Sequence, residues 1–332
     1  MSAIAGARVF VTGADGFIGS HLVEALVKAG ANVRALVYYN SWNAIGWLSD
    51  MPAEIVKEIE IFTGDVRDAE RIRQGVAGCA YVFHLASLVG IPYSYEAPRS
   101  YVDTNMGGAL NVLEACRQAD GLVRLIHVST SEVYGTAQTV PISESHPLVG
   151  QSPYSATKIA ADKLAESYHR AFGLPVVIAR PFNTFGPRQT ARAVIPTIAA
   201  QLLSGAEELK LGALSPTRDF NYATDMAAGM LALATCKAAE GEVVNLGTGT
   251  EWSIEQTARL VMELTGRLVP ICCEQERVRP GASEVNRLVA DTGKIRRLTD
   301  WQPATQFREG LRRTLDWMGR NLARFSPDRY VR

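Results

Sequence analysis

A tyrosine and a lysine four positions apart, Tyr154 and Lys158, have the clearest potential for chemistry. The surrounding apolar pattern predicts a helix over 153–172, and residues four apart share one face of a helix. A free tyrosine has a pKa of about 10, too high for a base at neutral pH. A lysine ammonium on the same face favours the phenolate, so this pair could remove a proton from a hydroxyl group.

A hydroxyl group and a carboxylate lie two residues apart in the run 129–135, where Thr130 could donate a hydrogen bond and Glu132 could act as a base. This run follows a predicted strand over 123–128, and open α/β folds bind ligands at the carboxyl ends of their strands. Hydride transfer from an alcohol needs only one base. A carboxylate beside the tyrosine, as a second base, therefore suggests proton removal from a carbon atom next to a newly formed ketone.

The glycine-rich run Thr12-Gly13-Ala14-Asp15-Gly16-Phe17-Ile18-Gly19 joins the first predicted strand to a predicted helix over 19–30. Gly13 would allow a tight turn, Gly16 would let a pyrophosphate approach the backbone, and Gly19 would let helix and strand pack closely. The N-terminus of the helix would present free N–H groups to the phosphates. The run predicts a dinucleotide site. The residues of this run that we expect to bind the cofactor are Gly13, Asp15, Gly16, Phe17 and Ile18.

The elements that must position these residues alternate between strand and helix. The predicted strands are 8–11, 33–37, 58–62, 80–85, 123–128 and 176–179, and the predicted helices are 19–30, 69–76, 99–119 and 153–172. This order predicts an α/β fold with a doubly wound, parallel, Rossmann-type sheet. We expect a dinucleotide-binding domain over 1–180, to which 220–250 returns with an edge strand at 243–246. A smaller, mostly helical substrate domain is expected over 181–332.

Charge and composition argue against several classes of protein. Lys plus Arg and Asp plus Glu each number 34 in 332 residues, so the basic excess of a nucleic-acid-binding protein is missing. No uncharged apolar run approaches about 18 residues, so no membrane span is expected. The five cysteines form no C-x-x-C pair, which favours reduced thiols in a cytoplasmic protein and no metal site.

The spacing G-x-x-G-x-x-G after a threonine resembles the short-chain dehydrogenase/reductase superfamily, in its extended branch of nucleotide-sugar enzymes. Four later segments resemble the same family in the same order. They are Gly64-Asp65-Val66, His84-Leu85-Ala86-Ser87, Tyr154-Ser155-Ala156-Thr157-Lys158 and Arg180-Pro181-Phe182-Asn183. The resemblance implies a nicotinamide cofactor. It implies contacts with that cofactor from Asp65, Val66, Leu85, Ala86, Ser87, Tyr154 and Lys158.

The second strand bears on the choice between NAD and NADP. NAD-binding members usually end this strand with an acid that binds the ribose 2′-hydroxyl group. That place falls near Val37, where the chain has no acid, and Arg34 lies inside the strand. NAD is the expected cofactor, with NADP as the alternative.

The segment 130–135 resembles nucleotide-sugar 4,6-dehydratases, above all those acting on GDP-mannose and those of the legionaminic-acid pathway, and also UDP-glucuronate decarboxylases. The segments 38–43, 181–189 and 216–220 are similar to the legionaminic-acid group. Ser131 stands where dTDP-glucose dehydratases carry Asp, so Glu132 or water would have to protonate the leaving hydroxyl group. The implied catalytic residues are Thr130, Ser131, Glu132, Tyr154 and Lys158.

A sugar nucleotide's diphosphate needs local positive charge in this neutral chain. Arg218 and Arg279 resemble the family's diphosphate-binding arginines. Asn183 ends the segment 180–183, which resembles the family's substrate-phosphate segment, and Arg188 lies in the segment 181–189; both are expected to contact the substrate. The resemblance implies a 4,6-dehydratase acting on UDP- or GDP-N-acetylglucosamine, in a homodimer formed through the helices at 99–119 and 153–172. A 4-epimerase, a UDP-glucuronate decarboxylase and a catalytically silent NAD-binding scaffold are the alternatives.

Overall fold

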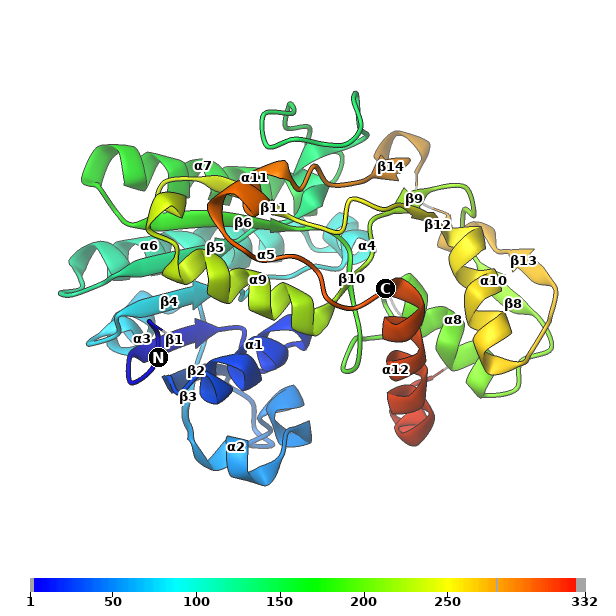
Figure 1. The fold of residues 1–332 in the computed structure, drawn as a ribbon, viewed down its shortest axis with the longest axis horizontal. Helices are drawn as coiled ribbons and strands as arrows, with labels where there is room; N and C mark the ends of the chain where they lie inside the picture. The colour runs from blue at the N-terminus through cyan, green and yellow to red at the C-terminus, as the bar shows by residue number, and fades with distance from the viewer. Residues whose placement is uncertain (1–2, 279, 327–332) are drawn as a thin grey trace.

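The computed structural model describes residues 3–278 and 280–326, and its centre is a parallel sheet of seven strands (Figure 1). The spatial order is β3-β2-β1-β4-β5-β6-β11. The bounds are β1 Arg8–Thr12, β2 Asn32–Tyr38, β3 Ile59–Gly64, β4 Tyr81–His84, β5 Arg124–Val128, β6 Val176–Pro181 and β11 Val243–Leu246. The expected Rossmann-type sheet is confirmed. The order reverses between β1 and β4, so the carboxyl ends of these two strands flank the crevice in which such folds bind ligands.

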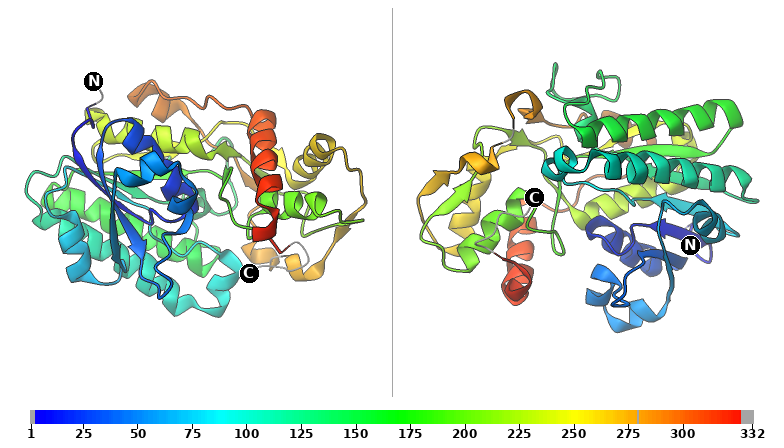
Figure 2. Two further views of the ribbon diagram at one scale, coloured as in Figure 1. Left: turned by 90° about the horizontal axis from the view of Figure 1, so that it is seen from below. Right: turned by 180° about the vertical axis from the view of Figure 1, so that it is seen from behind.

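Helices cover both faces of the sheet. One face carries α1 (Phe17–Lys28) and α9 (Ala223–Thr235). The other carries α3 (Ala69–Val76), α6 (Gly108–Gln118) and α7 (Pro153–Phe172). Helices α6 and α7 lie side by side on this second face (Figure 2, right). The parallel strands are thus buried on both sides, as their apolar sequences require.

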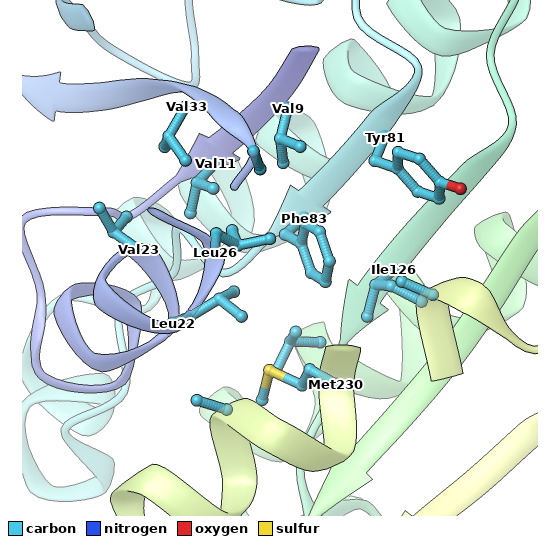
Figure 3. Packing of buried hydrophobic residues seen from close by; sticks show 14 of the residues in the cluster. Val9, Val11, Leu22, Val23, Leu26, Val33, Tyr81, Phe83, Ile126 and Met230 are labelled. Carbon is cyan, nitrogen blue, oxygen red and sulfur yellow. The ribbon is translucent and has the colours of Figure 1, made fainter. Parts of the chain in front are cut away.

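The core on the α1 side fixes the helix that follows the glycine-rich run. Leu22 and Leu26 of α1 pack against Val11 of β1 and Phe83 of β4, with Met230 of α9 closing the cluster (Figure 3). Val11 lies opposite Phe83 in the register of β1 and β4. Burying a side chain of this size contributes about 1.5–3 kcal/mol, so α1 is held firmly against the carboxyl end of β1.

A second body of the molecule lies beside the sheet (Figure 1). Its helices are α8 Val194–Leu203, α10 Ile254–Thr265 and α12 Phe307–Arg320, which enclose a separate apolar core. Its strand pairs are β8 Leu209–Leu211 with β13 Ile271–Cys273, and β7 Thr184–Phe185 with β10 Asn221–Tyr222. In a further sheet, β9 Thr217–Arg218 lies between β12 Trp252–Ser253 and β14 Arg287–Leu288. The short helices are α2 Ala53–Lys57, α4 Ile91–Glu96, α5 Pro98–Tyr101 and α11 Gly293–Leu298.

The chain passes between the two bodies more than once. After β6 it enters the second body, and α9 and β11 then bring it back to the sheet. The edge strand β11 pairs in parallel with β6, with Val244 opposite Ala179. Across the described residues, no helix is long and apolar enough to cross a membrane.

Candidate active site

The loop between β1 and α1 is as tight as its glycines predict. Gly13 has a φ of 68°, and a Cβ atom there would lie 2.8 Å from the backbone nitrogen of Ala86. A Cβ atom at Gly19 would overlap the carbonyl oxygen of Gly13. At Gly16, by contrast, a Cβ atom would meet only that same oxygen, at 3.2 Å. The loop is therefore packed on its inner side and has room at Gly16, where a pyrophosphate would approach.

The end of β4 is attached to this loop. The Thr12 hydroxyl accepts hydrogen bonds from the backbone nitrogens of Leu85 (3.2 Å) and Ala86 (3.1 Å). The same hydroxyl lies 2.8 Å from Nδ1 of His84. The structure thus brings the segment with Leu85, Ala86 and Ser87 against the glycine loop, as expected for residues that share one ligand.

Asp15 extends from the glycine loop to the end of β2. Its Oδ2 atom accepts a hydrogen bond from the backbone nitrogen of Tyr38 (3.1 Å), the last residue of β2. Its backbone oxygen accepts another from the nitrogen of Trp47 (3.0 Å). Burial raises the pKa of Asp15. Phe17 and Ile18, which follow Asp15 and Gly16 in the chain, form the first turn of α1.

Asp65 and Val66, two of the expected cofactor contacts, directly follow the end of β3 at Gly64. Arg67 Nε donates to both carboxylate oxygens of Asp65 at 3.0 Å, and this hydrogen bonding lowers the pKa of Asp65. Val66 is buried, and its carbonyl oxygen accepts a hydrogen bond from Asn111 (3.0 Å). The role of these two residues in binding the cofactor stays a prediction.

Helix α7 begins just before its two expected catalytic residues. The Ser152 hydroxyl caps the helix by accepting from the nitrogen of Ser155 (3.1 Å), and proline at 153 suits the first helical position. Tyr154 and Lys158 are 6% and 3% exposed. Lys158 Nζ donates to the carbonyl oxygen of Val128, the last residue of β5, at 2.7 Å. Burial lowers the pKa of Lys158 to about 8, which the charge of Asp162 opposes.

Thr130 and Glu132 lie next to Tyr154. The Thr130 hydroxyl caps a 3₁₀ turn over Ser131–Tyr134 and accepts from the nitrogen of Glu132 (3.2 Å). Burial raises the pKa of Tyr154, a hydrogen bond with Thr130 opposes this, and the charge of Glu132 adds to it. Lys158 is not among the groups that lower the pKa of Tyr154, so the tyrosine stays protonated in the protein without its cofactor. Ser131 is buried, whereas Glu132 is partly exposed.

An ion pair beneath the site was missed by the sequence reasoning. Asp162 is fully buried one helical turn after Lys158, and its Oδ2 accepts from Nε (3.0 Å) and Nη2 (2.9 Å) of Arg180. His127 Nε2 lies 3.4 Å from the other carboxylate oxygen, and burial lowers the pKa of His127. Arg180 also donates to the Tyr134 hydroxyl (3.0 Å). The spacing of four from Lys158 to Asp162 was the available signal.

Asn105 is a second residue that the sequence reasoning missed. The helix expected over 99–119 contains a π-helical stretch at Val102–Gly107, and Asn105 is buried within it. Its amide accepts from the nitrogen of Leu88 (2.8 Å) and donates to the oxygen of Leu88 (3.0 Å) and to the Thr157 hydroxyl (3.1 Å). π-Turns often occur at functional sites. Here the turn fixes the loop after β4 against α7.

The expected substrate residues fall in different surroundings. Asn183 is next to the segment of Arg218, because its carbonyl oxygen accepts from the nitrogen of Asn221 (2.8 Å). Its side-chain Oδ1 is buried and has no hydrogen-bond partner among the described residues. Arg218 is buried, and its guanidinium donates to the oxygen of Thr217 (2.9 Å) and to Glu284 (3.4 Å).

The two remaining arginines expected to bind the substrate are Arg188 and Arg279. Arg188 has a φ of 71° and points to α1, where it donates to Glu24 (3.1 Å) and Ser20 (3.4 Å). Arg279 lies outside the described residues. A role for either arginine in binding the diphosphate stays a prediction.

The crevice, the glycine loop and the buried Tyr154–Lys158 pair define a dinucleotide-binding α/β protein of the short-chain dehydrogenase/reductase type. Residues 10–314 match the family model described as GDP-mannose 4,6 dehydratase. The chain belongs to this family, which lies in the extended branch of the superfamily and includes nucleotide-sugar dehydratases, epimerases and decarboxylases.

Three similar proteins carry these three activities. The UDP-N-acetyl-alpha-D-glucosaminuronate decarboxylase of Bacillus cytotoxicus is 32% identical, over 93% of this chain and 97% of the relative. The dTDP-glucose 4,6-dehydratase structure from Streptomyces venezuelae, solved with NAD, has a TM-score of 0.83 and 30% identity, over 96% and 99% of the chains. The UDP-N-acetylglucosamine 4-epimerase structure from Methanobrevibacter ruminantium has a TM-score of 0.85 and 29% identity, over 96% and 99%.

Proposed function

We propose that this protein is an NAD-dependent nucleotide-sugar 4,6-dehydratase that forms a 4-keto-6-deoxy sugar nucleotide, with UDP- or GDP-N-acetylglucosamine as the expected substrate. The observation that carries the proposal is the partly exposed carboxylate of Glu132 beside Tyr154 and Thr130. Simple oxidation of an alcohol needs only Tyr154 as a base. A second base at the same carboxyl end of the sheet suits removal of a proton from C5.

NAD suits the residues that would hold it. The glycine loop leaves room at Gly16 for a pyrophosphate, and the Thr12 contacts hold the end of β4 alongside. When bound, NAD would accept hydride from C4, return hydride to C6 and place a positive charge beside Tyr154. Solved relatives that carry NAD support this choice over NADP.

The chain's own residues would handle the protons. Tyr154 Oη would take the proton of the C4 hydroxyl group while Thr130 holds the C4 oxygen. Glu132 would then take the C5 proton, which the new ketone makes acidic. Ser131 is not an acid, so Glu132, or water, would protonate the hydroxyl group that leaves C6. As hydride reaches C6, a proton from Tyr154, passed directly or through water, would return to C5, so that one water is lost overall. Lys158 would hold the nicotinamide ribose and stabilise the phenolate of Tyr154.

The substrate's diphosphate would be met by Asn183 and Arg218, whose segments lie side by side. A buried guanidinium is a strong site for phosphate oxygens, because its hydrogen bonds are charge-assisted and shielded from water. Arg279 would be the second arginine of this site, and Arg188 would reach it only by leaving Glu24.

We also propose that the enzyme works in the cytoplasm as a homodimer. The five cysteines are free, which suits a reducing compartment. The outer side of α6 and α7 has a hollow of about 400 Å³ lined by Met106, Gly107, Leu110, Ala160, Lys163 and Leu164. This apolar surface on two adjacent helices is the expected place for a two-fold contact.

Mass spectrometry of the purified protein with UDP-, GDP-, CDP- and dTDP-sugars tests the reaction. Loss of one water from a sugar nucleotide supports the proposal. Loss of carbon dioxide would identify a decarboxylase, and unchanged mass with altered retention would identify a 4-epimerase, as for the relatives above. If no sugar nucleotide reacts, the silent scaffold would be favoured.

A further inference from the structure

We infer that Asp15, in the glycine loop, supplies the carboxylate that binds the ribose 2′-hydroxyl group of NAD and rejects NADP. This inference rests on the proposed NAD dependence and adds the residue that sets it. Dinucleotide-binding folds usually place this acid at the end of the second strand, about 20 residues after the glycines. In this chain β2 ends at Val37 and Tyr38, and neither residue is acidic.

The structure puts a carboxylate at that place from another part of the chain. Asp15 Oδ2 accepts a hydrogen bond from the backbone nitrogen of Tyr38, 3.1 Å away, so the carboxylate lies against the last residue of β2. Asp15 is only partly buried, and the Tyr38 side chain is 57% exposed. A ligand lying over the end of β2 can therefore reach the carboxylate.

The loop after β2 holds Asp15 in position. Its backbone oxygen accepts a hydrogen bond from Trp47, and Gly46 packs so closely on Asp15 that a Cβ atom there would lie 2.9 Å from the Asp15 Cβ. Gly46 has a φ of 57°, which suits glycine. The loop after β2 thus covers Asp15 on one side and leaves its carboxylate facing the β2 end.

The nearby arginines do not offer a site for a 2′-phosphate. Arg34 lies inside β2 and donates to Glu60 (2.9 Å) and to the carbonyl oxygens of residues 74 (3.1 Å) and 75 (2.9 Å). Arg67 donates to Asp65, and Arg71 donates to the carbonyl oxygen of Thr63 (2.7 Å). With these charges already paired, a 2′-phosphate would meet the carboxylate of Asp15 and be repelled, whereas a hydroxyl group would donate to it.

Competition between NAD and NADP for the purified protein tests the inference without any sugar. The protein is incubated with both nucleotides, free nucleotide is removed, and the bound ratio is measured by mass spectrometry. We expect the native protein to retain NAD. Asp15→Asn should raise the bound ratio of NADP to NAD by about tenfold or more, since a charge-assisted hydrogen bond is lost and a repulsion removed. Asp15→Ser removes the carboxylate with a smaller side chain. It should raise the same ratio even if the amide of Asp15→Asn disturbs the loop.

Glu70→Gln is the matched control, because it removes one carboxylate from the nearby helix α3, where Glu70 pairs with Arg73. It should leave the bound ratio unchanged. An unchanged ratio in both Asp15 variants, with NAD still bound, would overturn the role of Asp15 while leaving the proposed function intact. Retention of neither nucleotide by the native protein would overturn both.

Discussion

Tyr154 and Lys158 are each buried in a way that opposes ionisation. Burial raises the pKa of Tyr154 and lowers that of Lys158 to about 8, so both neutral forms gain from the surroundings. The spacing of these residues was readable from the sequence, but this balance was not, because it depends on the depth of α7 below the crevice. The ion pair of Asp162 and Arg180 could not be read from the sequence either, since it joins α7 to β6.

Replacing Tyr154 with Phe removes only the phenolic oxygen. We expect this variant to lose the reduction of bound NAD on addition of the sugar nucleotide by at least about 100-fold, because Tyr154 is the proposed acceptor of the C4 hydroxyl proton. The nicotinamide absorbance in a single turnover measures this. Native amounts of reduced cofactor would show that Tyr154 is not the base, and unchanged NAD content verifies the variant's fold.

Glu132→Gln separates the two proton transfers. The amide keeps the shape of Glu132 but cannot take a proton, so oxidation at C4 should persist while dehydration stops. Mass spectrometry of the sugar after reaction in deuterated water measures the expected loss of deuterium entry at C5. Normal dehydration by this variant would assign the base to another residue.

The pH profile should report the ionisation of Lys158. A lysine is charged below its pKa, so activity that needs the ammonium should fall as the pH rises through about 8. Asp162→Asn removes the negative charge that favours the ammonium, and should therefore move the alkaline limb of kcat/KM to lower pH. Asp162→Glu should keep it near the native position. An alkaline limb that stays in place in Asp162→Asn would contradict this role.

At the scale of elements, the strand–helix alternation was predicted well because each strand is apolar and each helix periodic. The helix at 69–76 and the strand at 243–246 have the predicted bounds. The π-helical stretch around Asn105 was not predicted, because it depends on hydrogen bonds to Leu88 and Thr157 that come from other elements. Likewise, the contact of Asp15 with β2 is a product of the fold and leaves no local pattern.

The contact between α1 and the glycine loop gives a stability test. Gly19→Ala places a Cβ atom onto the oxygen of Gly13, and we expect a loss of about 1–3 kcal/mol in the free energy of unfolding together with weaker NAD binding. Gly319→Ala in α12 is the control, since a Cβ atom there meets nothing within 4 Å. Urea denaturation of both variants measures the difference. Equal stabilities would mean that the loop can shift to admit a side chain.

At the scale of the whole molecule, the outer side of α6 and α7 should decide the assembly. Leu110 is 39% exposed and lines the hollow on this apolar surface, and we expect Leu110→Glu to convert a dimer into a monomer. Leu268→Glu, at a more exposed leucine after α10, should leave the dimer intact. Sedimentation velocity measures both. A dimeric Leu110→Glu variant would place the contact elsewhere. A monomeric native protein would contradict the proposed dimer.

The return of the chain to the sheet has a consequence for biosynthesis. β6 leaves the ribosome about 60 residues before its neighbour β11, and α9 also emerges late. Until residue 246 is available, the nascent chain carries β6 as an open edge, with the backbone groups that later bind β11 unpaired. Its sequence is apolar at Val176, Val177 and Ile178, the kind of edge that recruits other strands. Completion of the seven-stranded sheet must therefore wait until α8, the short strands β8, β9 and β10, and α9 have been made.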